Sequence, residues 1–245
     1  MISVVCVYND LSIYTEYLLS SVQRQKGGHE LIAMDNRDGR FKSAAQALND
    51  GGRKANGAYI MFAHQDVRFY PETWLSDAEK MLDSLQNVGI AGVAGKKDWS
   101  GVKTVITHGD PPHQAGSLQS TEPLRVQTVD ECLFFIPKEV FVTVNFDERT
   151  CDNWHLYAAE YSLSVRERGL VAYALPLHVY HKSMGQFSEE YYTVLKKVIE
   201  KHKKYYLVIF ATTGNWLTVV PVSVQRAAYS FWKIIQVFVA SGRVR

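Results

Sequence analysis

The chain has 245 residues, of which 47% are hydrophobic and 21% charged, so it can bury a sizeable core and is not expected to be disordered. Its net charge of +2, without a long block of one sign, gives no electrostatic footprint for nucleic acid. The three cysteines are far apart and have no C-x-x-C spacing. They argue against a disulfide framework or a zinc knuckle and favour a cytoplasmic protein with reduced thiols.

Strands and helices are expected to alternate up to residue 95. The first residues have no basic lead-in and predict a strand instead of a signal peptide. Apolar runs of strand length occur at residues 2–7, 30–34, 58–63 and 89–94. Apolar residues at helical spacing predict helices between them, at about residues 11–22, 43–55 and 71–85. This alternation predicts an α/β fold with a mainly parallel sheet that helices cover on both faces.

The regular alternation stops after residue 95. Residues 96–124 contain several glycines and prolines and predict an irregular insertion with a hairpin near 102–107. The elements expected next are a strand at 126–136, a helix at about 154–168 that stops at Gly169, and short strands at 170–175 and 178–180. From residue 186 onward the chain is expected to be mainly helical. No stretch is long and apolar enough to predict a membrane span.

A polar cluster, His64-Gln65-Asp66, ends the third expected strand. Ligands of open α/β sheets bind at the carboxyl ends of the strands, so this cluster is placed where a ligand is expected. Side chains alternate along a strand, which predicts that His64 and Asp66 point to one side and Gln65 to the other. An isolated H-x-D motif more commonly marks a strand followed by a polar loop, so the wider context decides.

Four segments, in this order, resemble an inverting family 2 glycosyltransferase of the GT-A fold, in the bacterial glycosyltransferase-like branch. They are the opening strand Ile2–Asn9, Asp35 at the end of the second strand, the segment Asn49–Ile60 that leads into the D-x-D-like His64–Asp66, and the helix segment Tyr157–Gly169. The resemblance implies a Rossmann-like GT-A catalytic domain over residues 1–185. Its nucleotide-sugar half would be 1–95 and its acceptor half 96–185, followed by a C-terminal helical extension over 186–245.

The resemblance implies a metal-dependent glycosyltransferase. Such an enzyme moves a sugar, with inversion, from a nucleotide sugar, most simply a UDP-sugar, to a saccharide or lipid-linked acceptor in surface-polysaccharide or glycolipid assembly. The implied cofactor is Mn²⁺ or Mg²⁺, because a Lewis acid neutralises the diphosphate leaving group. His64 replaces the first aspartate of D-x-D, and Ala159-Glu160 replaces a Glu-Asp pair. These departures keep a second hypothesis open, a catalytically inactive nucleotide-sugar-binding protein. A nucleotidyltransferase is disfavoured because no Gly-rich, basic loop follows the first strand.

The resemblance also implies which side chains bind the donor. Metal binding is assigned to Asp66, His64 and His181, with a hydrogen-bonded loop histidine as the alternative for His181. The nucleotide and its sugar are assigned to His64 and Asp66 together with Tyr8, Asn9, Asp10, Asp35, Asn49 and Asp130. The alternative role of Asp10 is to cap the first helix, and that of Asp35 is to shape a turn.

Direct displacement needs a base that takes the proton of the acceptor hydroxyl. The resemblance places Glu160 in this role, with Asp152 as its rival. Glu160 lies on the otherwise apolar face of its helix, so its carboxylate is expected either in a site or paired with a cation. The expected acceptor contacts are Trp154 and His155. Glu131 should face away from its neighbour Asp130.

The C-terminal end carries an apolar stripe with basic residues nearby, from Arg226 to Arg245. This pattern permits peripheral contact with a membrane surface, where lipid-linked acceptors lie. A cytoplasmic location at the inner face of the membrane would fit. The alternative is that the stripe packs against the catalytic domain or a second subunit, as in a homodimer.

Overall fold

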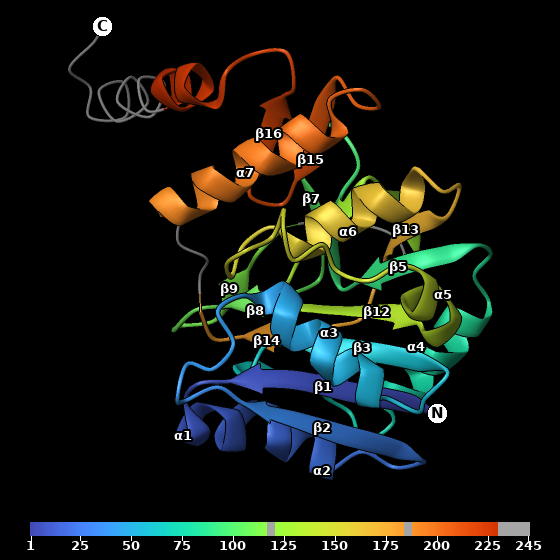
Figure 1. The fold of residues 1–245 in the computed structure, drawn as a ribbon. Coiled ribbons are helices and arrows are strands. Elements are labelled where there is room, and N and C mark those ends of the chain that lie inside the picture. Colours follow the sequence, from blue (N-terminus) through green and yellow to red (C-terminus); the bar gives the residue numbers. More distant parts are fainter. Residues whose placement is uncertain (117–120, 184–187, 230–245) are drawn as a thin grey trace, which may run out of the picture.

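The computed structural model describes residues 1–116, 121–183 and 188–229, and its centre is a seven-stranded sheet (Figure 1). The strands, in spatial order, are β10 (Leu124–Val126), β13 (Val171–Ala174), β5 (Val88–Gly92), β12 (Leu133–Pro137), β3 (Tyr59–Ala63), β1 (Ile2–Tyr8) and β2 (His29–Asp35). β1 is parallel to β2 and β3, and β13 is parallel to β5. β12 runs antiparallel to both of its neighbours. The predicted α/β fold with a mainly parallel sheet is confirmed.

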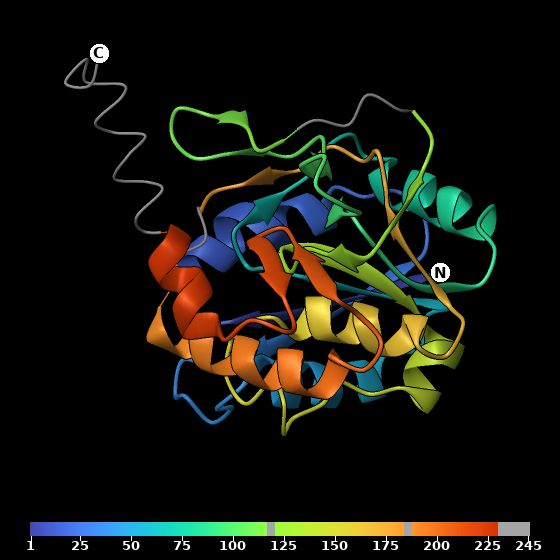
Figure 2. The same ribbon diagram turned by 90° about the horizontal axis from the view of Figure 1, so that it is seen from above.

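Helices cover both faces of this sheet (Figures 1 and 2). One face carries the helical stretch α1 (Leu11–Tyr14), η1 (Thr15–Leu19) and α2 (Ser20–Gln23), together with α4 (Trp74–Asp83). The other carries α3 (Ala44–Lys54), α5 (Lys138–Thr143) and α6 (Tyr157–Arg166), and α7 (Glu189–His202) packs outside α6. Alternate residues of β1 enter the two cores, Val4 on one side and Val5 on the other. Both layers are therefore built from the two-residue period of the strands.

Helix ends follow the expected capping chemistry. The Asp10 carboxylate accepts hydrogen bonds from the N–H groups of Ser12 and Ile13, at 2.9 and 3.0 Å, and so caps α1. Ser43 caps α3 in the same way. Gly169 adopts a φ of +82° just after α6, a conformation that glycine adopts without steric cost. Local sequence thus sets where these helices begin and end.

The inner face of α3 approaches the sheet closely, as its small residues predict. A Cβ atom on Gly51 would lie 2.5 Å from Cγ1 of Val5, and one on Gly52 would collide with the ring of Phe141. Glycine at these positions lets the helix backbone settle onto β1 and α5.

The segment predicted as a single strand over 126–136 is divided among three strands: β10, β11 (Thr128–Val129) and β12. β11 pairs with β6 (Ala94–Lys96), which also pairs with β7 (Val102–Thr104), so the chain changes sheets before it enters β12. A further small sheet joins β4 (Val67–Arg68), β14 (Tyr180–His181), β8 (Thr107–His108) and β9 (His113–Gln114). Periodicity in one segment does not reveal such a change of partner.

The C-terminal extension contains a hairpin that the sequence did not predict. β15 (Val208–Ala211) pairs with β16 (Gly214–Leu217) between α7 and a helical segment at residues 222–229. The hairpin is fixed from outside: Gln127 Oε1 accepts a hydrogen bond from the N–H of Phe210, and Thr128 donates one to its carbonyl. In the described part of the chain no helix has the length and apolarity to cross a membrane. The domain boundary at residue 185 stays a prediction.

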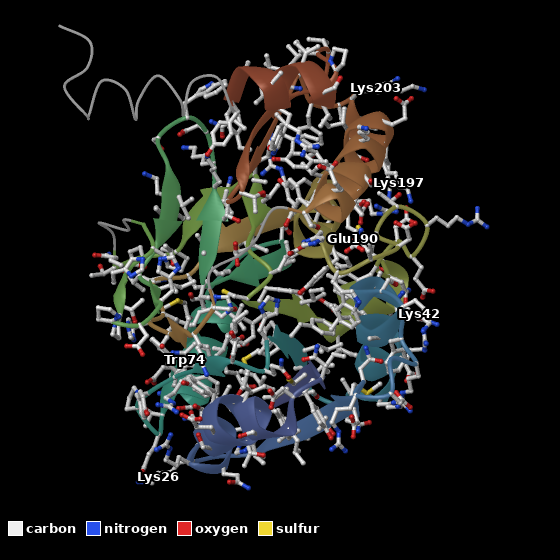
Figure 3. All side chains as sticks on the ribbon, turned by 90° about the vertical axis from the view of Figure 1, so that its left-hand side faces the viewer. Lys26, Lys42, Trp74, Glu190, Lys197 and Lys203 are labelled. Carbon is white, nitrogen blue, oxygen red and sulfur yellow. The ribbon has the colours of Figure 1, made fainter. Side chains whose placement is uncertain are left out.

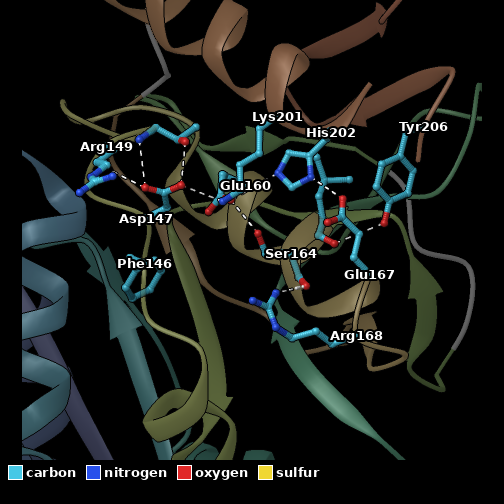
Figure 4. Close-up of polar contacts among 12 residues, drawn as sticks. Phe146, Asp147, Arg149, Glu160, Ser164, Glu167, Arg168, Lys201, His202 and Tyr206 are labelled. Atoms are coloured by element: carbon cyan, nitrogen blue, oxygen red, sulfur yellow. Dashed lines mark hydrogen bonds and ion pairs between the residues drawn. The ribbon is translucent and has the colours of Figure 1, made fainter. Parts of the chain in front are cut away.

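Charged side chains join α7 to α6 in a largely buried cluster (Figure 4). The Glu160 carboxylate is 1% exposed, and its Oε1 accepts hydrogen bonds from Lys201 Nζ at 2.5 Å and Ser164 Oγ at 2.7 Å. The buried ring of His202 lies 3.3 Å from the same oxygen and 2.5 Å from the carboxylate of Glu167. We call Glu160, Ser164, Glu167, Lys201 and His202 the α6–α7 ion cluster.

The α6–α7 ion cluster keeps Glu160 ionised. Burial raises the pKa of this carboxyl, but the hydrogen bond with His202, the charge and hydrogen bond of Lys201 and the hydrogen bond from Ser164 outweigh burial and hold the pKa below its ordinary value. The carboxylate on the apolar face of α6 is therefore paired with α7 across the helix interface. This pairing meets the requirement that a buried charge be matched.

We expect Glu160→Gln to lower the free energy of unfolding by about 3 kcal/mol, near the low end for breaking a buried pair because Lys201 stays partly solvated. Glu200→Gln, an exposed change on α7, is the matched control and should alter it by less than about 0.5 kcal/mol. Urea denaturation measures both. If Glu160→Gln kept wild-type stability while turnover was lost, the structural role would be contradicted.

The same variant should differ from the wild type in its pH dependence. Because the folded-state pKa of Glu160 is lowered, the stability it provides is complete above its unfolded value of about 4.5 and is lost as the pH falls through the folded value. The stability difference between wild type and Glu160→Gln should therefore shrink on acidification below that pH.

Candidate active site

A cleft of about 900 Å³ opens at the carboxyl ends of β1 and β3. Figure 3 views the molecule from this side, with Lys42 projecting at the outer edge. The lining residues include Tyr8, Asn9, Asn36, Arg37, Phe41, Lys42, Phe62, His64, Asp66, Glu131, Trp154, Tyr157 and Ser183. The volume lies within the range of ligand pockets, and the lining combines polar and charged side chains with apolar ones such as Phe41 and Phe62. This is the place where open α/β sheets bind ligands.

His64, Asp66 and His181 form a group whose ligand atoms lie within 4.8 Å of one another, so that it could hold a metal ion. His181 Nε2 is 3.3 Å from Asp66 Oδ1 and 3.3 Å from His64 Nδ1. Ser183 donates its N–H to Asp66 Oδ2 at 3.0 Å, which orients the carboxylate. His64 Nε2 lies 2.9 Å from the Tyr157 hydroxyl.

The protonation of this group suits a cation. Burial, and then the neighbouring His181, lower the pKa of His64 to about 4, so its ring is neutral at neutral pH and offers a lone pair. Burial alone would raise the pKa of Asp66, but the hydrogen bond and charge of His181 hold it well below its usual range. Two imidazole nitrogens and an ionised carboxylate lie within 4.8 Å of one another, and a bound cation would take over the positive charge that faces Asp66.

The prediction that strand alternation turns Gln65 away from His64 and Asp66 does not apply, because β3 ends at Ala63 and all three residues line the cleft. Gln65 instead joins two turns. Its Oε1 accepts hydrogen bonds from the N–H groups of Asn9 and Asp10, both at 3.0 Å, and its Nε2 donates to Asn9 Oδ1 at 2.7 Å. These bonds fasten the turn after β1 to the turn after β3. The two strand ends that line the cleft are thus held in a fixed relation.

At the other end of the cleft, the turn after β2 contributes Asn36 and Arg37. Asp35 itself is held by Arg37, whose Nη2 lies 2.6 Å from Asp35 Oδ2, and it is not among the lining residues. The hydrogen bonds from Arg37 hold the pKa of the Asp35 carboxyl far below its ordinary value. Asp35 is therefore placed to orient Arg37, which faces the cleft.

Several expected site residues lie elsewhere. The expected site residues outside the cleft lining are Asp10, Asp35, Asn49, Asp130, Asp152, His155, Glu160 and His181, of which His181 contacts the lining residues His64 and Asp66. Asn49 bonds the backbone of Phe146 through both of its polar atoms, and Asp130 accepts a hydrogen bond from Thr212 at 2.5 Å. Asp152 pairs with Lys197 at 2.5 Å.

Glu160, expected as the base, and His155, expected as an acceptor contact, do not face the cleft. Glu160 is enclosed in the α6–α7 ion cluster and does not face the cleft, because α7 supplies its partners. His155 packs edge-on against Tyr191, with ring centroids 5.8 Å apart, while its neighbour Trp154 does line the cleft.

Sequence reasoning did not select Asn36, Arg37, Lys42 or Ser183. Asn36 and Arg37 directly follow Asp35 at a strand end, so the position of that strand could have singled them out. Lys42 and Ser183 come from loops whose course depends on tertiary contacts.

The chain is similar to several known proteins along most of its length. A model of a family described as "Glycosyltransferase like family" matches residues 3–202. A curated protein of Fuscovulum blasticum, described as "ATP synthase subunits region ORF 6", is 24% identical over 232 residues, which cover 88% of this chain and 89% of that protein. The match therefore extends along nearly the whole length of both.

Solved structures share the fold at low sequence identity. GalNAc-T7 with UDP, GalNAc and Mn²⁺ has a TM-score of 0.59 at 14% identity, over 82% of this chain and 47% of that chain. The mannosyltransferase PcManGT from Pyrobaculum calidifontis, in complex with GDP-Man and Mn²⁺, has a TM-score of 0.55 at 13% identity, over 84% and 64%. TarS 1–349 of S. aureus in complex with UDP-GlcNAc has a TM-score of 0.53 at 13% identity, over 82% and 66%.

This chain spans from 47% to 66% of the length of these three structures, and the likeness to them is one of fold. The matched family model, in contrast, covers most of the chain. The resemblance seen in the sequence is thereby confirmed. The chain belongs to the glycosyltransferase-like family and has the GT-A fold.

Proposed function

We propose that the protein transfers a sugar, with inversion, from a nucleotide sugar to a hydroxyl of a saccharide or lipid-linked acceptor. The observation that carries the proposal is the His64–Asp66–His181 group, which lies at the strand end where the cleft begins. Family membership supports it, as do the UDP, GalNAc and Mn²⁺ bound by GalNAc-T7 and the GDP-Man and Mn²⁺ bound by PcManGT. The most economical donor is a UDP-sugar, the class bound by TarS.

The donor set of the His64–Asp66–His181 group favours Mn²⁺ over Mg²⁺. Magnesium prefers oxygen ligands in an octahedral arrangement, whereas imidazole nitrogen suits the transition metals. When bound, the cation would act as a Lewis acid on the diphosphate of the donor. For His64 to ligate through Nδ1, its Nε2 carries the proton and donates it to the Tyr157 oxygen, an outer contact typical of metal-binding histidines.

The remaining residues of the cleft would bind and orient the donor. Asn9, Asn36 and Arg37 offer hydrogen bonds to a base and ribose at the ends of β1 and β2. Arg37 and Lys42 supply positive charge toward an anionic ligand, and Phe41 contributes apolar surface. This arrangement fits a nucleotide sugar, whose base is planar and polar and whose diphosphate is anionic.

The acceptor would approach from the side of Trp154, which lines the cleft and is 41% exposed. An exposed indole offers a sugar ring an apolar face and a hydrogen-bond donor. The stripe expected to contact a membrane or a second subunit includes Phe231 and Phe238, which lie outside the described residues. Peripheral membrane contact and a homodimer stay predictions.

Turnover of a donor panel tests the proposed function. We expect the protein with Mn²⁺ to release UDP from at least one UDP-sugar, and proton NMR of the product to show inversion at the anomeric carbon. A second candidate, a nucleotide-sugar-binding protein without turnover, is favoured by the position of Glu160 away from the cleft. Calorimetric UDP binding without release from any donor would support that candidate and contradict the enzyme.

Asp66→Asn and His181→Gln test the metal group. We expect each to weaken Mn²⁺-dependent UDP binding at least about tenfold, because each removes a ligand atom or its charge. His113→Gln, at an exposed histidine of β9, is the matched control and should bind UDP and Mn²⁺ like the wild type. Isothermal titration with UDP at fixed Mn²⁺ gives the comparison. Wild-type affinity in Asp66→Asn would refute metal binding by this group.

A further inference from the structure

A second carboxylate lines the cleft apart from the metal group. Among the lining residues that the structure describes, acidic side chains come from Asp66 and Glu131. Asp66 is engaged with His181 and Ser183. Glu131 belongs to the loop between β11 and β12, next to Asp130, which is turned toward Thr212. The cleft therefore contains a carboxylate with no role in the donor site.

One carboxylate oxygen of Glu131 lacks a hydrogen-bond partner in the described part of the chain. Its Oε1 is shielded from water and has no hydrogen-bond partner among the described residues. The Tyr157 hydroxyl, which lies 2.9 Å from the ring of His64, is 3.5 Å from the backbone carbonyl of Glu131. One of the two carboxylate oxygens of Glu131 thus has no hydrogen-bond partner among the described residues, and the backbone of Glu131 is joined to His64 through Tyr157. An unpaired buried oxygen is costly to retain in a fold that does not use it.

The start of α6 faces this carboxylate. The N–H groups of Leu156, Tyr157 and Ala158 lower the pKa of Glu131, and a helix N-terminus stabilises negative charge. Leu156 adopts a φ of 61°, a left-handed conformation that is strained for leucine, and as the N-cap residue it makes no side-chain capping bond of its own. The strained turn directs the first N–H groups of α6 to the side of the cleft on which Glu131 lies.

We propose that Glu131 is the general base of the transfer, the group that accepts the proton of the acceptor hydroxyl. The proposal rests on the proposed function. In the step, the acceptor oxygen bonds to the anomeric carbon of the donor while the bond from that carbon to the diphosphate oxygen breaks. Its electron pair leaves with the nucleoside diphosphate. The hydroxyl proton passes to Glu131, which becomes a carboxylic acid and later releases the proton to water.

The proton affinity of Glu131 suits this role. Burial first, and then the charge of Asp130, raise the pKa of Glu131 well above its ordinary value, against the smaller effect of the α6 N–H groups. A carboxylate with a raised pKa takes up a proton more readily than an exposed one, as general-base catalysis near neutral pH requires. An acceptor hydroxyl would also give the carboxylate the hydrogen bond that it lacks.

The test uses hydrolysis of a UDP-sugar in the presence of Mn²⁺, in which water replaces the acceptor. We expect Glu131→Gln to lower kcat at least about 100-fold, the usual range for a general base, while the Kd for UDP with Mn²⁺ stays within about twofold. Glu131→Asp, which keeps the acid but shortens it, should retain intermediate activity. Glu139→Gln, at an exposed carboxylate of α5, is the matched control and should hydrolyse the donor at the wild-type rate.

Stability separates catalysis from a structural role. Because Glu131 has an unpaired oxygen, Glu131→Gln should melt at or above the wild-type temperature, whereas a structural carboxylate would lower it. Hydrolysis by Glu131→Gln at more than half the wild-type rate would overturn the assignment while the proposed function stands. Loss of UDP binding in Glu131→Gln would overturn it as well. A wild-type protein that binds UDP but hydrolyses no donor would overturn both proposals.

Discussion

Strand pairing brings His181 to the end of β3, and the chemistry of the cleft depends on that contact. β14 pairs with β4, which places His181 opposite Val67, directly after Asp66. The backbone strengthens the contact, since Lys182 donates its N–H to the carbonyl of Asp66 at 3.1 Å. Two segments 117 positions apart thereby form one group before any ligand arrives. A preformed group of this kind avoids the entropic cost of assembling ligands during binding.

Three carboxylates near the middle of the molecule have different environments, and these separate their roles. Asp66 is kept ionised by His181 beside the cleft, and Glu160 is kept ionised by Lys201 and His202 within the α6–α7 ion cluster. Glu131 has a raised pKa because burial dominates its surroundings. Groups of the same chemical type can thus serve a cation, an interface and a proton transfer. Two of the three carboxylates lie at α6, which carries Glu160 and begins beside Glu131.

Much of the fold could be predicted from the sequence because its signals are local. The apolar run before His64 and the polar residues that follow it set β3 and its end. His64 and Asp66 come after that end, and their place just past the strand, not alternation along it, brings them to the cleft. The cap at Asp10 and the small face of α3 are likewise properties of single segments. Parallel pairing then brings the ends of β1, β2 and β3 to one edge, as strand-end residues predicted.

What the sequence did not reveal depends on partners far along the chain. Glu160 lies in a motif that resembles the one carrying the base in family 2 glycosyltransferases. Its hydrogen-bond partners Lys201 and His202, however, belong to α7, 41 and 42 positions away. The hairpin of β15 and β16 is held by Gln127 and Thr128, more than 80 positions earlier. Glu131 was expected only to face away from Asp130, and its place in the cleft follows from the turn that precedes α6. One segment's pattern cannot specify contacts of this range.

The most direct test of the account is the nitrogen ligation of Mn²⁺ in the protein–UDP complex. Electron–nuclear double resonance on protein labelled with ¹⁵N-histidine reports nitrogen atoms bound to the ion. We expect strong coupling to two histidine nitrogens, from His64 and His181, and the loss of one of these couplings in His181→Gln. A Mn²⁺–UDP complex without histidine coupling would contradict it, because the cation would then be bound elsewhere or by oxygen ligands alone.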